Sequence, residues 1–376
     1  MGTLGIGAMH GICYDLDLKY FTGVPDSTFK GWISFLESGE GDFQHRVAAN
    51  EGAAVGHAAG YHLATGKVPV VYMQNSGLGN CVNPLTSLAN SAIYGIPMVL
   101  MIGWRGEPSQ KDEPQHAQMG KILEPLLNVL DIPFVILEAG AADVQIREMK
   151  EQAVQESGPV ALVIRKGLFQ SFGGGSKPGE RKGMSREEAL EQVLDSLKGN
   201  EIFVGTTGKT SRELFELRAK KGQGHGCDFY IVGSMGHASA IAMELALQMP
   251  RRDIYLLDGD GALIMHMGTL GTIGSYQPSN LHHILLDNQC HESTGGQPTV
   301  SEALDFKKIA LGNSYQSVEC CHTPSELAMA MASKVVGPRM VVVGIRPGSR
   351  SDLGRPTTSP KENKVNLMRE LSQHAN

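Results

Sequence analysis

Two side chains that carry oxygen ligands, Asp260 and Asn288, each follow a short apolar run that the sequence predicts as a β-strand. The runs are residues 254–257 and 283–286, and a helix-like segment lies between them. This order predicts a βαβ unit, in which both side chains reach the same edge of a parallel sheet. A carboxylate and an amide oxygen suit Mg²⁺, and the glycines on either side of Asp260 let the backbone approach a phosphate closely.

Two other interpretations fit parts of this segment. A Gly-Asp-Gly sequence on its own is a common turn. An EF-hand calcium loop is excluded, because its positions 5, 6 and 12 would be Ala262, Leu263 and Thr269. The spacing of 28 residues between Asp260 and Asn288, inside a predicted βαβ unit, favours the metal site.

The elements that would position these residues form two halves of the chain. In the first half, helical stretches separate five apolar runs: 20–24, 68–73, 98–102, 134–137 and 160–164. This alternation predicts a parallel sheet covered by helices on both faces, so the fold class is α/β with two doubly wound domains. The predicted domains are residues 1–168 and 185–376, joined by a linker at 169–184 that is rich in Gly, Ser and Pro.

The bulk composition is that of a globular protein with two domains of ordinary size. The chain has 376 residues, of which 41% are hydrophobic and 19% charged, and its net charge is −6. The negative charge and the lack of a basic cluster argue against nucleic-acid binding. The six cysteines form no Cys-x-x-Cys pair, which predicts reduced thiols in a cytoplasmic protein. Because no apolar run approaches 18 residues, we expect no membrane span.

Glu51 is the single acid in a helix-like run of small residues, 48–61. Small side chains let helices pack closely, and such a run suits a subunit contact. A glutamate at a helix N-terminus is often a surface residue that compensates the helix dipole. Alternatively, burial among Ala and Gly would raise its pKa above the usual value of about 4.3, as an acid that works near neutral pH requires.

Polar or glycine residues follow three of the apolar runs in the first half. Asp26 and Ser27 follow the first run, and either caps the next helix or points into a cleft. Gly77 follows the second run, in an ordinary βα turn or in a turn against a ligand. His116 lies in the polar loop after the third run, either in solvent or in an active site.

Two further turns in the second half follow predicted strands. Thr206 and Thr207 lie in a segment of glycines and hydroxyls before a helix expected at 212–220, which predicts a diphosphate cradle. The other turn consists of Gly233, Ser234 and Met235. Met235 is either a core residue or a contact to a ligand.

Together these features resemble the thiamine-diphosphate-dependent decarboxylases, and within them the phosphonopyruvate decarboxylase family. The resemblance rests on the Gly-Asp-Gly to Asn288 spacing, the preceding half with Glu51, the loop 291–297 and the segment 355–358. Two departures are Asp287, where the family has Asn, and Ala262, where it often has Ser, so a phosphate contact there needs backbone N–H. The short linker leaves no room for the extra domain of pyruvate decarboxylase and acetolactate synthase.

The resemblance implies thiamine diphosphate and Mg²⁺ as cofactors. It implies that Asp260, Asn288 and the carbonyl of Cys290 bind Mg²⁺. It also implies that Glu51 shares a proton with the pyrimidine ring of the cofactor. The other cofactor contacts would be Gly77, Thr206, Thr207, Gly233, Ser234, Met235, Gly261 and Ala262. Because Glu51 and Asp260 come from different subunits in this family, at least a homodimer is expected, with the active site at the subunit interface.

The implied reaction is decarboxylation of 3-phosphonopyruvate to phosphonoacetaldehyde and CO₂, in phosphonate biosynthesis. The candidates for proton transfer, besides Glu51, are Asp26, His116, His291 and Glu292. The candidates for substrate binding are Ser27, Arg346, Arg350 and Arg355. Alternatives are a sulfopyruvate decarboxylase, whose two halves are often separate chains, an acetolactate-type carboligase, or a partner protein that binds the cofactor without turnover.

Overall fold

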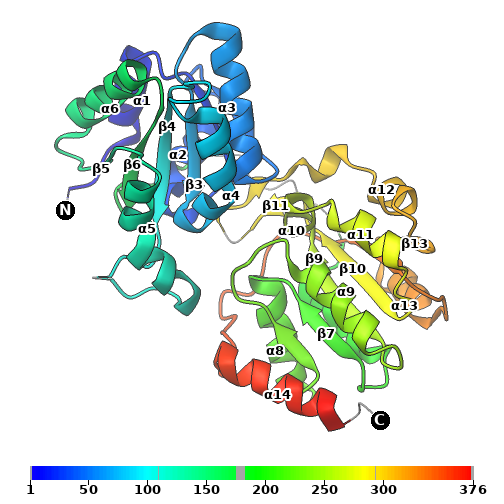
Figure 1. Ribbon diagram of the computed structural model, residues 1–376. Coiled ribbons are helices and arrows are strands. Elements are labelled where there is room, and N and C mark those ends of the chain that lie inside the picture. The colour runs from blue at the N-terminus through cyan, green and yellow to red at the C-terminus, as the bar shows by residue number, and fades with distance from the viewer. Residues whose placement is uncertain (1, 109, 175–182, 293, 374–376) are drawn as a thin grey trace. The chain divides into compact units, whose positions relative to one another are not determined.

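The computed structural model describes residues 2–108, 110–174, 183–292 and 294–373. It divides into two compact units, Met1–Lys177 and Pro178–Asn376 (Figure 1). Each unit has its own parallel six-stranded sheet, and each is described by itself. In the described residues, no helix is long and apolar enough to cross a membrane.

The sheet of the first unit has the strand order β2-β1-β3-β4-β6-β5, and every pair is parallel. Its strands are β1 (Tyr20–Gly23), β2 (Gln44–Val47), β3 (Val70–Gln74), β4 (Met98–Trp104), β5 (Phe134–Ile136) and β6 (Pro159–Arg165). Its α-helices are α1 (Ile6–Asp15), α2 (Lys30–Ser38), α3 (Glu51–Thr65), α4 (Leu78–Pro84), α5 (Ala117–Val129) and α6 (Ala142–Glu156). Shorter turns are η1 (Ser27–Phe29), η2 (Asn75–Gly77), η3 (Leu85–Ala89) and η4 (Pro114–His116).

The core of this unit has two layers because successive strand residues point to opposite faces of the sheet. In β3, Val70 and Tyr72 pack with α1, α2 and α6, whereas Val71 and Met73 pack with α3, α4 and α5. The central strands β3, β4 and β6 are apolar on both faces, as expected for a sheet buried between two helical layers.

The sheet of the second unit has the order β13-β14-β10-β9-β7-β8, again parallel throughout. Its strands are β7 (Ile202–Gly205), β8 (Asp228–Tyr230), β9 (Ile254–Gly259), β10 (Leu281–Asp287), β13 (Ser317–Cys321) and β14 (Arg339–Gly344). Its α-helices are α7 (Arg186–Asp195), α8 (Lys209–Lys220), α9 (Ala238–Gln248), α10 (Asp260–Met265), α11 (Thr269–Tyr276), α12 (Phe306–Gly312), α13 (Pro324–Ala332) and α14 (Pro360–Gln373). A small hairpin, β11 (Cys290–His291) with β12 (Gln297–Pro298), and the turn η5 (Val300–Ala303) complete it.

This unit is also layered on both faces of its sheet. Helices α7, α8 and α13 cover one face, where Leu257 and Leu286 point, and α9, α11 and α12 cover the other, where Leu256 and Leu285 point. Ser185 caps α7 through the capping box predicted by a serine with a glutamate three residues later, at Glu188.

Two elements differ from the expectations. Strand β2 was not predicted, because its residues Gln44–Val47 are polar and half exposed at the sheet edge, which leaves no apolar run to detect. Helix α8 begins at Lys209 and not near residue 212, so the last residues of the predicted phosphate cradle form its first turn.

Candidate active site

The strand order of each sheet reverses at one point, and predicted site residues follow the strands that meet there. In the first unit β1 adjoins β3, so Asp26 and Ser27 lie near the strand end that leads to Gly77. In the second unit β7 adjoins β9, so Thr206 and Asp260 follow neighbouring strands. Ligands of doubly wound sheets bind outside the carboxyl ends of the strands at such a point.

Glu51 is the first residue of α3, and it is buried, with 6% of the residue exposed. Asn80 Nδ2 donates a hydrogen bond to Glu51 Oε2 at 2.7 Å. A Cβ atom at position 77 would collide with the Glu51 carboxyl group, so the absence of a side chain at Gly77 makes room for the acid. This burial argues against a surface residue that only compensates the helix dipole.

Asp26 caps the turn η1 that follows β1, as one of its two alternatives predicted, and it is a buried acid. Its Oδ1 accepts a hydrogen bond from Thr28 N at 2.8 Å, and only 1% of the residue is exposed. Burial raises the pKa of Asp26. A Cβ atom at Gly103 would lie 2.6 Å from Asp26 Oδ1, so the end of β4 packs directly against this carboxyl group.

His116 and Ser27 lie with Asp26 around one cation, Arg105. Arg105 Nη1 donates to Ser27 Oγ at 3.3 Å, and the charges of Arg105 and Asp26 attract each other. Burial lowers the pKa of His116 to about 4, and the Arg105 charge adds to the lowering. The imidazole is therefore neutral near pH 7 and able to accept a proton.

The predicted cofactor turns of the second unit contact one another. Gly233 N donates to Thr207 Oγ1 at 2.9 Å, which joins the turns after β8 and β7. Ser234 has a φ of 44°, which residues other than glycine rarely adopt. A Cβ atom at Gly261 would lie 3.3 Å from Met235 Cε.

A Cβ atom at Gly261 would also lie 3.2 Å from the ring of His291. The hairpin that starts at Cys290 therefore reaches the Gly-Asp-Gly turn. Burial lowers the pKa of His291 to about 4, which leaves this ring neutral near pH 7 as well. Thr206 and Ala262 are both buried beside these turns, with 4% of each residue exposed.

Asp260 is the first residue of α10, and only 2% of it is exposed. Its Oδ2 accepts a hydrogen bond from Thr299 Oγ1 at 2.5 Å. Burial raises the pKa of Asp260 to about 7, and the nearby Asp287 carboxylate contributes to the rise. In the described part of the chain, no Lys, Arg or His side chain pairs with this carboxylate.

Asn288 follows β10, and the neighbouring strands β9 and β10 bring it to the same sheet edge as Asp260. Its Oδ1 accepts a hydrogen bond from Cys290 N at 3.1 Å, and its Nδ2 donates to Glu292 Oε2 at 3.1 Å. Both atoms of the side-chain amide are therefore oriented. A ligand set here would combine one carboxylate with amide and carbonyl oxygens, because no group of three His, Cys, Asp or Glu side chains suited to a metal occurs among the described residues.

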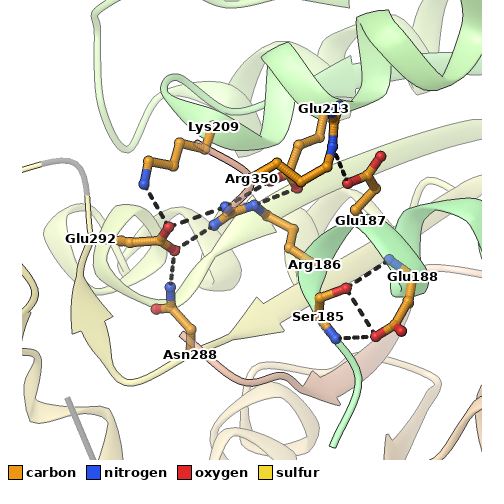
Figure 2. Close-up of polar contacts among 9 residues, drawn as sticks. All are labelled: Ser185, Arg186, Glu187, Glu188, Lys209, Glu213, Asn288, Glu292 and Arg350. Carbon is orange, nitrogen blue, oxygen red and sulfur yellow. Dashed lines mark hydrogen bonds and ion pairs between the residues drawn. The ribbon is translucent and has the colours of Figure 1, made fainter. Parts of the chain in front are cut away.

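Glu292 lies between two cations (Figure 2). It accepts hydrogen bonds from Lys209 Nζ at 2.7 Å and Arg186 Nη1 at 3.0 Å. Arg186 in turn donates to both carboxylate oxygens of Glu213, at 2.9 and 3.0 Å. Burial alone would raise the pKa of Glu292, but the two cations lower it to about 2. A carboxylate fixed in this way holds Asn288 in place, and it does not suit the proton transfer that the sequence suggested.

The three arginines near the C-terminus, Arg346, Arg350 and Arg355, are exposed. Arg350 already contacts three carboxylates, those of Glu187, Glu216 and Asp352. Arg346 Nη1 lies 3.3 Å from Glu188 Oε2 and donates a hydrogen bond to the backbone carbonyl of Gly183. A phosphonate would be repelled by these acids, so the geometry of Arg346 and Arg350 does not support the predicted role in substrate binding.

Several residues of these clusters had no role assigned from the sequence, among them Arg105, Arg186 and Thr299. Arg105 directly follows β4, so the rule that ligands meet strand ends could have found it. Arg186 and Thr299 reach their partners from 106 and 39 residues away, and no local pattern marks such contacts.

Comparison with known proteins agrees with this arrangement. Residues 7–124 match the model of the thiamine pyrophosphate enzyme, N-terminal TPP binding domain, and residues 206–345 match that of the C-terminal TPP binding domain. The two matches place thiamine-diphosphate-binding folds in the first and the second unit.

The chain is also similar to curated proteins over most of its length. It is 37% identical to phosphonopyruvate decarboxylase of Streptomyces viridochromogenes, covering 92% of this chain and 90% of that protein. It is 36% identical to the protein of the same name from Streptomyces hygroscopicus, covering 92% and 89%. Sulfopyruvate decarboxylase of Methanosarcina acetivorans is 31% identical, over 69% of this chain and 70% of that protein. From this likeness and from the two domain matches, the chain belongs to the phosphonopyruvate decarboxylase family of thiamine-diphosphate-dependent enzymes.

Proposed function

We propose that this chain decarboxylates 3-phosphonopyruvate to phosphonoacetaldehyde and CO₂ in phosphonate biosynthesis, with thiamine diphosphate and Mg²⁺ bound. The observation that carries the proposal is the buried Glu51, held by Asn80 in a space that only glycine at position 77 leaves open. Bound thiamine diphosphate supplies a carbon nucleophile and an electron sink for the electrons released when CO₂ leaves.

Glu51 would serve the pyrimidine end of the cofactor. Its Oε2 is fixed by Asn80, while Oε1 faces the Cα of Gly77. A carboxyl group shielded from water in this way can share a proton with a ring nitrogen of the cofactor, which activates the cofactor for reaction.

Asp260, Asn288 and the carbonyl of Cys290 would hold Mg²⁺, which would bind the cofactor's diphosphate. Oxygen ligands suit this hard cation. The donor set fits because Asp260 is a buried carboxylate close to a second one, Asp287, and a cation would balance their charge. The turns at Thr206, Thr207 and Gly233 would contact the rest of the cofactor, with Met235 beneath its rings.

The reaction replaces CO₂ on the carbonyl carbon by a proton, so a group of the protein must deliver that proton. His116 and His291 are the candidates for this role. Because burial lowers the pKa of each imidazole to about 4, the ring must first take up a proton, and once protonated it gives that proton up readily. The aldehyde then leaves and the same group takes up a proton from solvent for the next turnover.

Sulfopyruvate decarboxylation is the second candidate function. It is favoured by the likeness to the protein of that name from Methanosarcina acetivorans, which covers 69% of this chain. The two substrates differ only in the acid at carbon 3, so the choice depends on residues that bind this group.

We also propose that the protein self-associates, with the active site at the subunit interface. Glu51 and Asp260 serve opposite ends of one cofactor and belong to different compact units of the chain. The small-residue face of α3, which follows Glu51, is suited to close packing against a second copy.

The aldehyde-release assay tests the function. The wild-type protein is expected to release phosphonoacetaldehyde from phosphonopyruvate only with thiamine diphosphate and Mg²⁺, and to act more slowly on sulfopyruvate under equal conditions. Glu51→Gln should lower kcat by about 100-fold or more while cofactor binding by calorimetry persists. Glu148→Gln, an exposed acid on α6, is the control and should behave as wild type. Equal turnover by Glu51→Gln would refute the assigned role.

The space at Gly77 gives a second prediction. Gly77→Ala should displace the Glu51 carboxyl group and reduce kcat by about 10-fold or more, because a small misplacement of a catalytic group is costly. Gly79→Ala is a matched control two residues away, since a Cβ atom at Gly79 meets no atom within 4 Å. Steady-state kinetics compares the two variants. An equal loss of kcat in both variants, or no loss of kcat in either, would contradict the steric argument.

The contact between Glu292 and Asn288 gives a third prediction. Glu292→Ala removes the acceptor that orients the Asn288 amide, so Mg²⁺ should bind about 10- to 100-fold more weakly. The measurement is a calorimetric titration with Mg²⁺ in the presence of thiamine diphosphate. Glu302→Ala changes an exposed acid nearby and should leave the titration unaltered. Unchanged Mg²⁺ affinity in Glu292→Ala would show that Asn288 does not depend on this contact.

A further inference from the structure

The backbone of Arg105, at the end of β4, is held by the side chain of Asn75. Asn75 Nδ2 donates to Arg105 O at 2.8 Å, and Arg105 N donates to Asn75 Oδ1 at 3.3 Å. The preceding residue, Trp104, is fixed as well, because its indole N–H donates to Gly120 O at 2.9 Å. The start of the Arg105 side chain is thus set by β3 and β4, the rigid part of the fold.

One edge of the guanidinium group is taken up by Asp112. Arg105 Nε and Nη2 donate to the two carboxylate oxygens of Asp112 at 2.8 and 2.6 Å. Asp112 also accepts from the backbone N–H of Gly106 and of Glu113, each at 2.8 Å. This bidentate pair orients the plane of the guanidinium group, and the remaining nitrogen, Nη1, points towards Ser27 Oγ at 3.3 Å.

The groups around Nη1 are those of the candidate active site. Asp26 is close enough for its charge to act on Arg105, and the charge of Arg105 acts on His116. The side chain of Arg105 is 17% exposed, so it is accessible from the strand ends while largely shielded from water. A cation in such a place is attractive to an anion that enters the site.

We propose that Arg105, with Ser27, binds the phosphonate group of the substrate and thereby determines which 2-oxo acid the enzyme accepts. The proposal rests on the proposed function. The substrate carries two anionic groups, but only the phosphonate keeps its charge throughout the reaction. A cation against the carboxylate would stabilise the ground state more than the transition state, because that charge is lost as CO₂ leaves.

The surroundings of Arg105 distinguish it from Arg350. Arg350 contacts three carboxylates on an exposed surface. Arg105 forms its bidentate ion pair with Asp112, the charges of Asp26 and Glu113 also act on it, and its Nη1 is directed at Ser27. Ser27 Oγ can rotate its proton to donate to a phosphonate oxygen.

An interaction with a charge that does not change during the reaction is made equally in the ground state and the transition state. Its loss raises KM and leaves kcat nearly unaltered. If Arg105 instead only braces the loop or positions Asp26, its loss would lower kcat for every 2-oxo acid. Kinetics therefore separates binding of the phosphonate from a positioning role.

The experiment compares Arg105→Gln and Arg105→Lys with wild type, each as the full chain with thiamine diphosphate and Mg²⁺. For phosphonopyruvate, Arg105→Gln should raise KM about 10-fold or more with kcat within about 3-fold, and Arg105→Lys should give an intermediate KM. Arg147→Gln, on the surface of α6, is the control and should leave both constants unchanged. An unchanged KM in Arg105→Gln, or a loss confined to kcat, would overturn the proposal.

A second measurement is independent of turnover. Calorimetry with 3-phosphonopropionate, which has the phosphonate and carboxylate but no carbonyl, should show binding to wild type and about 10-fold or more weaker binding to Arg105→Gln. If wild type releases no aldehyde but binds this probe through Arg105, the proposed function fails and the anion site stands. If the probe binds wild type and Arg105→Gln equally, or binds neither, the site is refuted. Thermal melting verifies that the variants fold. If Arg105→Gln does not fold, Arg105→Lys takes its place in both comparisons.

Discussion

The buried Glu51 carboxyl group, with Asn80 donating to one oxygen and Gly77 leaving room for the other, constrains the whole first unit. Burying an acid without a partner is costly, so the neighbouring elements must supply a donor and exclude competing side chains. Helix α4 supplies Asn80, and the turn before it supplies a residue without Cβ. Gly52, the next residue of the helix that carries Glu51, also lies against this partner, because a Cβ atom there would lie 2.9 Å from Asn80 O.

The second unit also contains buried carboxyl groups that need partners, and some of these partners are held by charged side chains. Asp260 and Asp287 place two carboxylates at the ends of adjacent strands, and each accepts a hydrogen bond from a hydroxyl group, of Thr299 and Ser301. Asn288, which directly follows Asp287, is oriented by Glu292, whose own charge is balanced by Arg186 and Lys209. The side chains that we propose as Mg²⁺ ligands are thus held in place by partners outside the proposed ligand set, which is how proteins commonly tune a metal site.

The sequence predicted those parts of the fold and site that leave a local pattern. Apolar runs such as 98–102 marked the central strands, and the spacing from Asp260 to Asn288 marked the unit that β9 and β10 form. Strand β2 has no such run, because it is a polar edge strand. The pairing of Arg186 with Glu292 joins residues 106 positions apart, so only the folded chain reveals it. Arg350 is a similar case, since two of its acidic neighbours come from helices that are distant in sequence.

The most direct test of the central claim is complementation between two inactive variants, Glu51→Gln and Asp260→Asn, produced together in one cell. If one cofactor is bound by Glu51 of one copy and Asp260 of another, mixed dimers contain one intact site. Random pairing should then restore about a quarter of the wild-type rate of aldehyde release. A mixture that is no more active than either variant alone would contradict a shared site between subunits.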